Sequence, residues 1–282
     1  MPIQILADSC CDLTPALKSL LGLRHIPLEL RPGPGQCFVD DETLDTHLLL
    51  QAMKATKEAT GTACPSPEAY AQAMRGCDEC VVITLSAKLS GSYNAAVMGR
   101  DLVLEEEPEK KIFILDSESA AAGETRLALL LFDLVRAGLP FEEVTAQACA
   151  FRDKMRTLFV LEDLSNLIKN GRISKAAGVI GSMLSLRPIM SDNGHGEIAC
   201  LEKVRGTANA LTKLVARVGE MTRDAAAHSV QLVMSQCNCT ERALGLKKAL
   251  LEACPALEDV LIVPAAGVST VYANDGGIVI AF

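Results

Sequence analysis

Residues 81–93 read Val81-Val82-Ile83-Thr84-Leu85-Ser86-Ala87-Lys88-Leu89-Ser90-Gly91-Ser92-Tyr93. Four of the first five residues are apolar and four are β-branched, which predicts a short buried strand. A serine-rich loop follows, and a helical pattern begins near Tyr93. In an open parallel α/β sheet, the loop that follows a strand lies in the crevice at the carboxyl ends of the strands, where ligands bind. The stretch therefore predicts a strand, a loop with a candidate ligand site, and a helix.

Similar units occupy the rest of the first half of the chain. Apolar runs predict further strands at residues 3–7, 25–30 and 112–115, with helical patterns between them. Two helix starts are marked by Thr14-Pro15 and Ser66-Pro67, where a capping hydroxyl precedes a proline. The alternation predicts an α/β fold with a mainly parallel sheet in an N-terminal lobe.

Strand and helix patterns also alternate in the second half of the chain, with segments of different lengths. Helical patterns over 127–138 and onward to about 154 place a boundary near Met155, which gives lobes of 1–155 and 156–282. The turn composition of Asp192-Asn193-Gly194 predicts a hairpin. Beyond the boundary, strands are expected at 158–161, 187–191, 197–204, 230–234, 257–263 and 277–281, and helices at 163–170, 174–184, 207–222 and 240–252.

Composition and charge disfavour nucleic-acid binding. The chain has 282 residues, 49% of them hydrophobic and 22% charged, which is typical of a folded globular protein. Its formal net charge of -8 would repel a phosphate backbone. Tryptophan is absent and aromatic residues make up 4%, so platforms for stacked bases are not expected.

The N-terminal sequence and the cysteines indicate a compartment. Met1-Pro2-Ile3-Gln4 does not resemble a signal peptide, and no apolar run approaches the about 18 residues of a membrane span. We therefore expect a cytoplasmic protein with no stable membrane insertion, whose eleven cysteines are reduced. Cys77-x-x-Cys80 and Cys237-x-Cys239 could suggest zinc, but the pairs are far apart in sequence and the second has an unusual spacing. No metal and no cofactor are expected.

Two segments have the residue types of an anion site. Thr62 and Ser66 lie just before a predicted helix start, where unpaired amides and hydroxyls can hold an anion. Ser90, Gly91 and Ser92 form the second segment, and Gly91 would allow close approach to the backbone. Each segment could equally be a helix cap with no ligand.

An enzymatic alternative uses Ser90 or Ser92 as the nucleophile of an acyl hydrolase or transferase. Such a serine needs a neighbouring base. None of His25, His47, His195 and His228 lies in a segment that obviously supplies one. A kinase acting alone is disfavoured because neither GxGxxG nor GxxxxGK[ST] occurs.

Six segments together resemble the DegV family of bacterial fatty-acid-binding proteins. They extend in family order over most of the chain, and as a set they are highly specific. The segments are Ile5-Leu6-Ala7-Asp8-Ser9, Thr62-Ala63-Cys64-Pro65-Ser66-Pro67, Leu89-Ser90-Gly91-Ser92-Tyr93, Leu115-Asp116-Ser117, Asn170-Gly171-Arg172-Ile173-Ser174 and Lys203-Val204-Arg205-Gly206.

The resemblance implies a two-lobed α/β fold with one long-chain fatty acid between the lobes. Family members include carrier subunits that present the acid to a separate fatty acid kinase, which forms an acyl phosphate. The resemblance places the carboxylate at Thr62 and Ser90, with Gly91 and Ser92 in support. It further implies that Arg172 orients the head-group region. By the same resemblance, Arg205 would face the kinase.

Two positions depart from the family pattern. The family commonly has a histidine near the C-terminus that completes the head-group network, and here Tyr272 takes its place. A phenol can donate a hydrogen bond to a carboxylate but adds no positive charge near neutral pH. Ala63 stands where the family usually has serine. Lipid binding is expected to survive these changes, whereas the handoff to a kinase would be altered.

A fatty acid tail needs an apolar wall. Residues 176–186, which include Met183, Leu184 and Leu186, are a candidate for that wall, and an ordinary core helix is the alternative. Burying about 14 methylenes at about 0.8 kcal/mol each would supply most of the affinity, and the hydroxyls would set the orientation.

Overall fold

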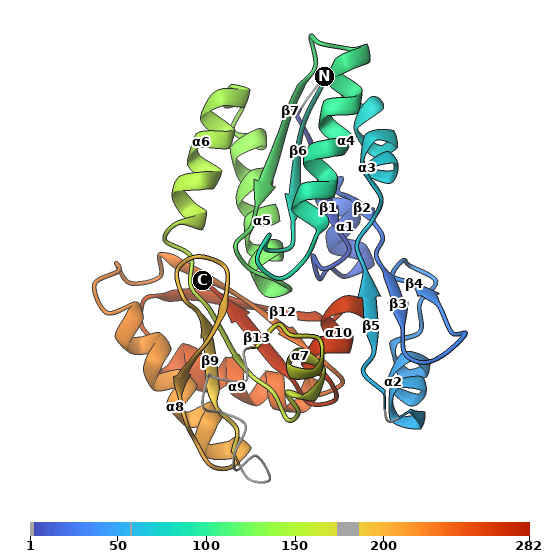
Figure 1. Cartoon of the computed structure of the whole chain (residues 1–282). Helices are drawn as coiled ribbons and strands as arrows, with labels where there is room; N and C mark the ends of the chain where they lie inside the picture. The colour runs from blue at the N-terminus through green and yellow to red at the C-terminus, as the bar shows by residue number, and fades with distance from the viewer. Residues whose placement is uncertain (1–2, 57, 174–185) are drawn as a thin grey trace.

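The structure, a computed structural model, describes residues 3–56, 58–173 and 186–282 (Figure 1). Helices and strands alternate through these residues and form three sheets within them. The predicted α/β class is confirmed. The expected helix over 174–184 and most of the candidate tunnel wall over 176–186 lie outside the described residues.

The first sheet is parallel and has the strand order β2-β1-β6-β7. Its strands are β1 (Gln4–Asp8), β2 (Arg24–Ile26), β6 (Glu79–Thr84) and β7 (Lys111–Asp116). Alternate residues of a strand point to opposite faces. Accordingly Val82 packs toward α3 (Pro67–Arg75) and α4 (Ser92–Glu106), while Val81 packs toward α5 (Ala122–Arg136). The predicted caps are present, because Thr14 accepts from Leu17 at the start of α1 (Pro15–Leu21) and Ser66 accepts from Ala69 in α3.

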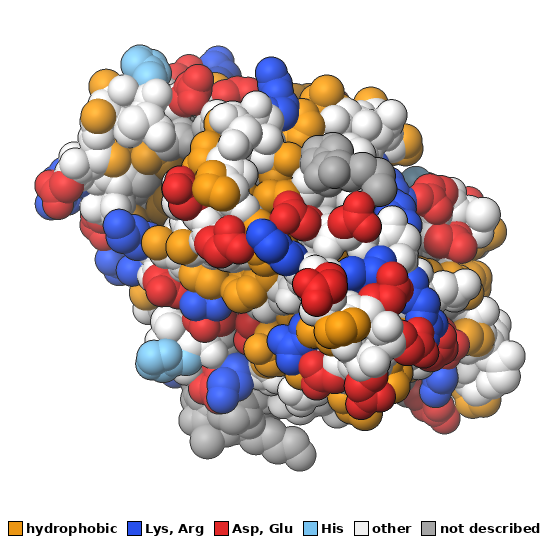
Figure 2. All heavy atoms as spheres, turned by 90° about the horizontal axis from the view of Figure 1, so that it is seen from above, with side chains coloured by type: hydrophobic (Ala, Val, Ile, Leu, Met, Phe, Trp, Pro, Cys, Tyr) orange, Lys and Arg blue, Asp and Glu red, His pale blue; other side chains and the backbone are white. Residues whose placement is uncertain are grey.

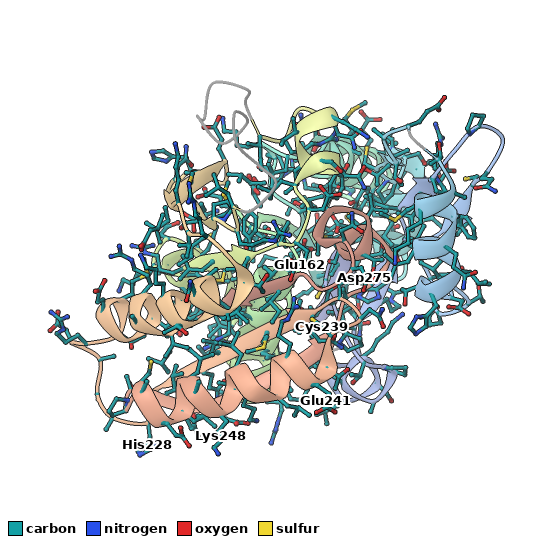
Figure 3. The ribbon with its side chains drawn as sticks, turned by 90° about the horizontal axis from the view of Figure 1, so that it is seen from below. Glu162, His228, Cys239, Glu241, Lys248 and Asp275 are labelled. Carbon is teal, nitrogen blue, oxygen red and sulfur yellow. The ribbon has the colours of Figure 1, made fainter. Side chains whose placement is uncertain are left out.

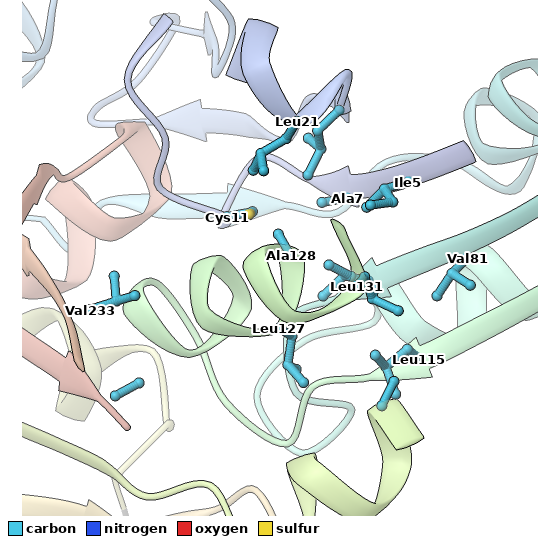
Figure 4. Packing of buried hydrophobic residues seen from close by; sticks show 14 of the residues in the cluster. Ile5, Ala7, Cys11, Leu21, Val81, Leu115, Leu127, Ala128, Leu131 and Val233 are labelled. Atoms are coloured by element: carbon cyan, nitrogen blue, oxygen red, sulfur yellow. The ribbon is translucent and has the colours of Figure 1, made fainter. Parts of the chain in front are cut away.

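Helix α5 lies between two sheets. It contacts β1 and β6 on one side and β11 (Val230–Gln236) and β13 (Ile278–Ala281) on the other. One hydrophobic cluster therefore includes Leu127 of α5 together with Val81 and Val233 from the two sheets (Figure 4). Helix α6 (Phe141–Arg152) follows α5 and packs beside it.

The second sheet is mixed, with the order β10-β9-β8-β13-β11-β12. Strand β11 is parallel to β12 (Leu257–Pro264), and the other neighbours are antiparallel. The predicted hairpin is confirmed, because β9 (Ile189–Asp192) and β10 (Ile198–Glu202) pair on either side of Asn193 and Gly194. The remaining elements in this half are β8 (Thr157–Val160), α7 (Ser165–Lys169), α8 (Thr207–Met221), α9 (Thr240–Ala253) and α10 (Gly267–Ala273).

The prediction of one strand over 25–30 is wrong. Strand β2 ends at Ile26, and β3 (Glu29–Arg31) belongs to a separate antiparallel sheet with β4 (Phe38–Val39) and β5 (Gly61–Ala63). Pro27 separates the two strands, and proline has no backbone N–H for a ladder. Leu28 instead donates its N–H to the Ser9 hydroxyl. Helix α2 (Thr46–Ala55), capped by Asp45, lies between β4 and β5 in the sequence and was not predicted.

The strands of the first and third sheets all precede Met155, and those of the second sheet all follow it. We propose that these sets correspond to the lobes 1–155 and 156–282. Among the described residues, none of the helices is both long and apolar enough to cross a bilayer. On the face shown in Figure 2, basic and acidic side chains are interspersed over the described surface.

Candidate functional site

A pocket lies between one face of the second sheet and the loops at the carboxyl ends of the first. Its floor includes Thr157, Phe159 and Leu161, which are alternate residues along and just beyond β8. Val279 of β13 pairs with Phe159 and also lines the pocket. Alternate residues of a strand share a face, so the pocket runs along β8.

The roof comes from segments that are far apart in the sequence. Leu85, Leu89 and Ser90 follow β6, and Ala120 follows β7, so the pocket lies where the parallel-sheet rule places a ligand. Helix α10 closes one side. Apolar lining residues of the roof and sides include Leu85, Leu89, Ala120, Leu167, Val268 and Ala273.

The structure brings four of the six sequence-predicted site residues into this pocket. Thr62, Ser90, Arg172 and Tyr272 all line it. Gly91 and Ser92 follow Ser90 in the sequence, at the start of α4, and are not part of the lining.

Thr62 and Tyr272 form one part of the polar end. Thr62 is held in β5, opposite Leu30 of β3. Its hydroxyl lies 2.9 Å from the Tyr272 hydroxyl. Tyr272 is carried by α10, whose first amides, on Gly267 and Val268, donate to the Asp40 carboxylate at 2.7 and 2.9 Å. The two hydroxyls thus come from a strand and from a helix that are far apart in the sequence, and they meet at the pocket.

Ser90 forms the other part of the polar end. Its hydroxyl donates to the Ser92 hydroxyl at 3.2 Å and accepts from the Ser92 amide at 3.2 Å. Ser92 is fully buried and also hydrogen-bonds Asp8 at the end of β1. Asp8 in turn accepts from the amides of Cys10 and Leu85 at 3.1 and 2.9 Å. The serine loop is therefore anchored to the first sheet.

The two polar segments touch each other at Gly91. A Cβ atom added at Gly91 would lie 3.2 Å from the Cys64 sulfur. This is closer than ordinary van der Waals contact, so the absence of a side chain lets the segment after Thr62 approach the loop of Ser90.

Arg172 lies at the same end with its guanidinium over the Tyr272 ring, 5.7 Å from the centroid. Its side chain donates to the carbonyls of Leu89 and Asn170 at 3.2 and 2.7 Å. Asn170 donates to the Thr60 carbonyl at 2.9 Å. Arg172 therefore orders the polar end and provides a positive charge beside it.

Buried carboxyl groups lie beneath the pocket. Burial raises the pKa of Asp12 to about 7, although the Ala266 amide donates to its Oδ1 at 2.8 Å. Burial, together with the nearby Asp8 charge, raises the pKa of Glu124 well above its ordinary value. Raised pKa values favour the neutral forms, which reduces electrostatic repulsion of an anion in the pocket.

The four histidines lie outside the described lining of the pocket. His25 belongs to β2, and burial lowers its pKa to about 4. His228 lies at the opposite end of α9 from Asp275, which follows α10 (Figure 3). A histidine base for Ser90 is therefore not found among the residues that line the pocket.

Several lining residues were not singled out from the sequence. Phe159 and Leu161 belong to a strand that was predicted, and its period of two could have indicated a shared face. Ser269 lies on α10, which was not predicted, so no local pattern marked it. Ser119 and Thr157 form a buried hydroxyl pair, 2.6 Å apart, toward the other end of β8.

Together, the fold and the pocket define a class: an α/β protein with an apolar chamber between two sheets and a polar end made of hydroxyls and one arginine. The family model described as "Uncharacterised protein, DegV family" matches residues 2–282. The chain belongs to the DegV family.

Solved structures and a sequence relative support this membership. A DegV family protein of Ruminococcus gnavus, refined with vaccenic acid, is 37% identical, with a TM-score of 0.93 and coverage of 99% of each chain. The Streptococcus pneumoniae Fatty Acid Kinase (Fak) B3 protein, loaded with linoleic acid, is 32% identical with a TM-score of 0.90, over 100% of this chain and 99% of the other. A DegV domain-containing protein of Streptococcus pneumoniae is 34% identical over 286 aligned residues, which cover 100% of this chain and 99% of the relative.

Proposed function

We propose that this protein binds one long-chain fatty acid in the pocket, with the carboxylate at Thr62 and Ser90 and the tail along β8. The observation that carries the proposal is the separation of a hydroxyl-lined end of the pocket from its apolar middle. Hydroxyls of Thr62, Ser90 and Tyr272 gather at one end, and apolar side chains line the middle. Similar proteins loaded with vaccenic or linoleic acid support the ligand class.

The free energy of binding would come mainly from the tail. Each buried methylene contributes about 0.8 kcal/mol, so about 14 of them contribute roughly 11 kcal/mol before the cost of association, which is about 4 to 15 kcal/mol. Each hydrogen bond to the carboxylate adds about 1.5 to 3 kcal/mol. The hydroxyls therefore fix which end of the lipid lies beside Tyr272.

The site favours a carrier over a hydrolase. Ser90 donates its hydroxyl hydrogen to Ser92, and none of the four histidines is among the described residues that line the pocket. A serine nucleophile needs a base within hydrogen-bond reach. We infer a non-enzymatic role in which the lipid is held and released unchanged.

Native mass spectrometry tests the binding proposal directly. Protein purified without added lipid is expected to carry one acid of roughly 16 to 18 carbons, a length matched to the methylene count above. Protein that remains free of lipid, and whose melting temperature does not rise with added palmitate or oleate, would contradict the proposal.

A double variant tests the placement of the carboxylate. Thr62→Ala with Ser90→Ala removes two donors and is expected to weaken binding by about 100-fold or more. The matched control is Thr212→Ala with Ser229→Ala, which removes one threonine and one serine hydroxyl at exposed positions. Equal affinity of both double variants would rule out the assigned head-group residues.

We further propose that the loaded protein works in the cytoplasm and presents its acid to a separate fatty acid kinase, with Arg205 at the contact. Arg205 is exposed, and its backbone forms an isolated antiparallel β-bridge with Leu186. The similarity to the Fak B3 protein supports a kinase partner. Arg205→Glu is expected to reduce ATP-dependent acyl phosphate formation while lipid loading is unchanged, and Arg223→Glu, at another exposed arginine, should not. Equal turnover of the two variants would remove Arg205 from the interface.

A further inference from the structure

Two cysteines lie at the end of the first sheet that is remote from the pocket. Cys77 follows α3, and Cys80 is the second residue of β6, whose other end leads to Ser90. Their side chains are almost fully buried, with 2% of Cys77 and 0% of Cys80 exposed. All eleven cysteines, these two included, are free thiols in the structure.

Cys77 is in direct contact with a cation. The Arg24 guanidinium donates to the Cys77 sulfur at 2.9 Å and to the Ala73 carbonyl at 3.0 Å. Lys110 donates to the backbone carbonyl of Cys77 at 2.7 Å, which places a second positive charge nearby. Positive charge close to sulfur favours the thiolate, which is the reactive form of cysteine.

Cys77 and Cys80 belong to the same buried hydrophobic cluster. The neighbouring Cys80 thiol and the Arg24 and Lys110 charges lower the pKa of Cys77. The neighbouring Cys77 and burial raise the pKa of Cys80. The thiolate is therefore favoured at Cys77, and Cys80 keeps its proton.

A metal site explains this pair poorly. Structural zinc is normally held by four ligands. Among the described residues, no cluster of three or more His, Cys, Asp and Glu side chains could hold a metal ion. In addition, the Arg24 guanidinium occupies one side of the Cys77 sulfur.

We propose that Cys77 and Cys80 are a redox-active dithiol that hydrogen peroxide converts into an intramolecular disulfide. The Cys77 thiolate attacks one peroxide oxygen, the O–O bond breaks, and the leaving hydroxide takes a proton to form water. The Cys80 sulfur then attacks the Cys77 sulfenic acid. The S–O bond breaks, and the second hydroxide leaves with the Cys80 proton as water. Two electrons pass from the thiols to the peroxide, and a dithiol reductant reverses the change.

In this proposal Arg24 both stabilises the Cys77 thiolate and covers the Cys77 sulfur. Its side chain is exposed, whereas the sulfur that it contacts is buried. Displacement of this one side chain would open Cys77 to a small oxidant. Disulfide formation would then remove the negative charge that Arg24 binds. Cytosolic disulfides of mesophilic proteins are typically transient and redox-sensing, which suits such a pair.

The test uses the folded wild-type protein and hydrogen peroxide, followed by alkylation under denaturing conditions and tryptic mass spectrometry. Cleavage after Arg75 and Lys88 gives a peptide that contains Cys77 and Cys80 as its only cysteines. After peroxide, this peptide is expected to lose two hydrogen atoms and resist alkylation, and dithiothreitol should restore it. Peptide that still takes two alkyl groups, or that carries sulfinic acid on Cys77 beside a free Cys80, would overturn the proposal.

Variants separate this chemistry from a merely structural role. Cys80→Ser should stop at a Cys77 sulfenic acid that dimedone traps. Arg24→Gln should shift the pH profile of Cys77 alkylation to higher pH and slow peroxide oxidation severalfold, and Arg24→Lys should restore part of the rate. Arg31→Gln, at an exposed arginine of β3 paired with Glu29, is the matched control. Identical pH profiles for Arg24→Gln and Arg31→Gln would refute the role of Arg24.

Discussion

The hydroxyl groups of Thr62 and Tyr272 lie 2.9 Å apart although 210 residues separate them in the sequence. One is carried by a strand of the small antiparallel sheet and the other by α10. Their contact forms one part of the polar end of the pocket, and a carboxylate beside the pair would accept a hydrogen bond from each hydroxyl once their mutual hydrogen bond is given up.

Tyr272→Phe should weaken fatty acid binding while the ring that Arg172 covers stays in place. The lost hydrogen bond to a charged group is expected to cost about 1.5 kcal/mol, which is roughly tenfold in Kd. Displacement of a fluorescent fatty acid measures the change. Tyr93→Phe, at a half-buried tyrosine outside the pocket lining, is the control. If both variants bind equally well, the Tyr272 hydroxyl does not contact the ligand.

Gly91→Ala should push apart the two polar segments, because the new methyl group would meet the Cys64 sulfur at 3.2 Å. We expect affinity to fall by less than about tenfold, since the exposed Cys64 side chain can move. Adding Cys64→Ala should recover most of the loss, and Cys64→Ala alone should bind normally. A double variant that remains as weak as Gly91→Ala would show that the contact does not set the spacing.

Val279→Phe should shorten the chamber, because Val279 lines it opposite Phe159. Each methylene that the larger ring displaces forfeits about 0.8 kcal/mol, so long acids should lose more affinity than short ones. Calorimetry with a series of chain lengths measures this. Val39→Phe, on the exposed strand β4, is the control for adding a ring. A uniform loss across the series would mean that the tail takes another path.

Ionisation of the buried Asp12 carboxyl should lower the free energy of unfolding as pH rises. Burial raises its pKa from 3.8 to about 7, so the folded state keeps a proton that the unfolded chain releases. This contribution is complete below the unfolded pKa and is lost as pH rises through the folded pKa, at most about 4 kcal/mol.

Asp12→Asn keeps an acceptor for the Ala266 amide but cannot ionise. Its free energy of unfolding, measured by urea denaturation from about pH 5 to about pH 8, should fall less than that of the wild type. Asp224→Asn, at an exposed aspartate, should leave the slope unchanged. Parallel curves for wild type and Asp12→Asn would show that Asp12 does not hold the proton.

Much of the first sheet could be predicted from sequence because its signals are local. The strand over 81–85, the serine loop and the caps at Thr14 and Ser66 depend on neighbouring residues alone. The site was harder. Strand β5 has three residues, too few to show a period, and it exists by pairing with β3. Thr62 was a candidate from the residue types of its segment, whereas Tyr272 entered the prediction through family resemblance. Neither periodicity nor capping indicated that the two would meet.

Helix α10 was missed for a specific physical reason. Its first amides are capped by Asp40, which lies 227 residues away from Gly267. A capping signal normally lies within three residues of the amides that it satisfies. Asp40 lies far outside any such local window, so the sequence around Gly267 showed no signal for the start of a helix.

The same cap limits how the chain can be divided. A polypeptide cut near Met155 would leave Tyr272 on a helix whose anchoring carboxylate sits on the other fragment. Split reporters or circular permutants built from this scaffold must therefore keep both pieces in one assembly before a lipid headgroup can be recognised. Reassembly of the pieces would itself become a readout of occupancy.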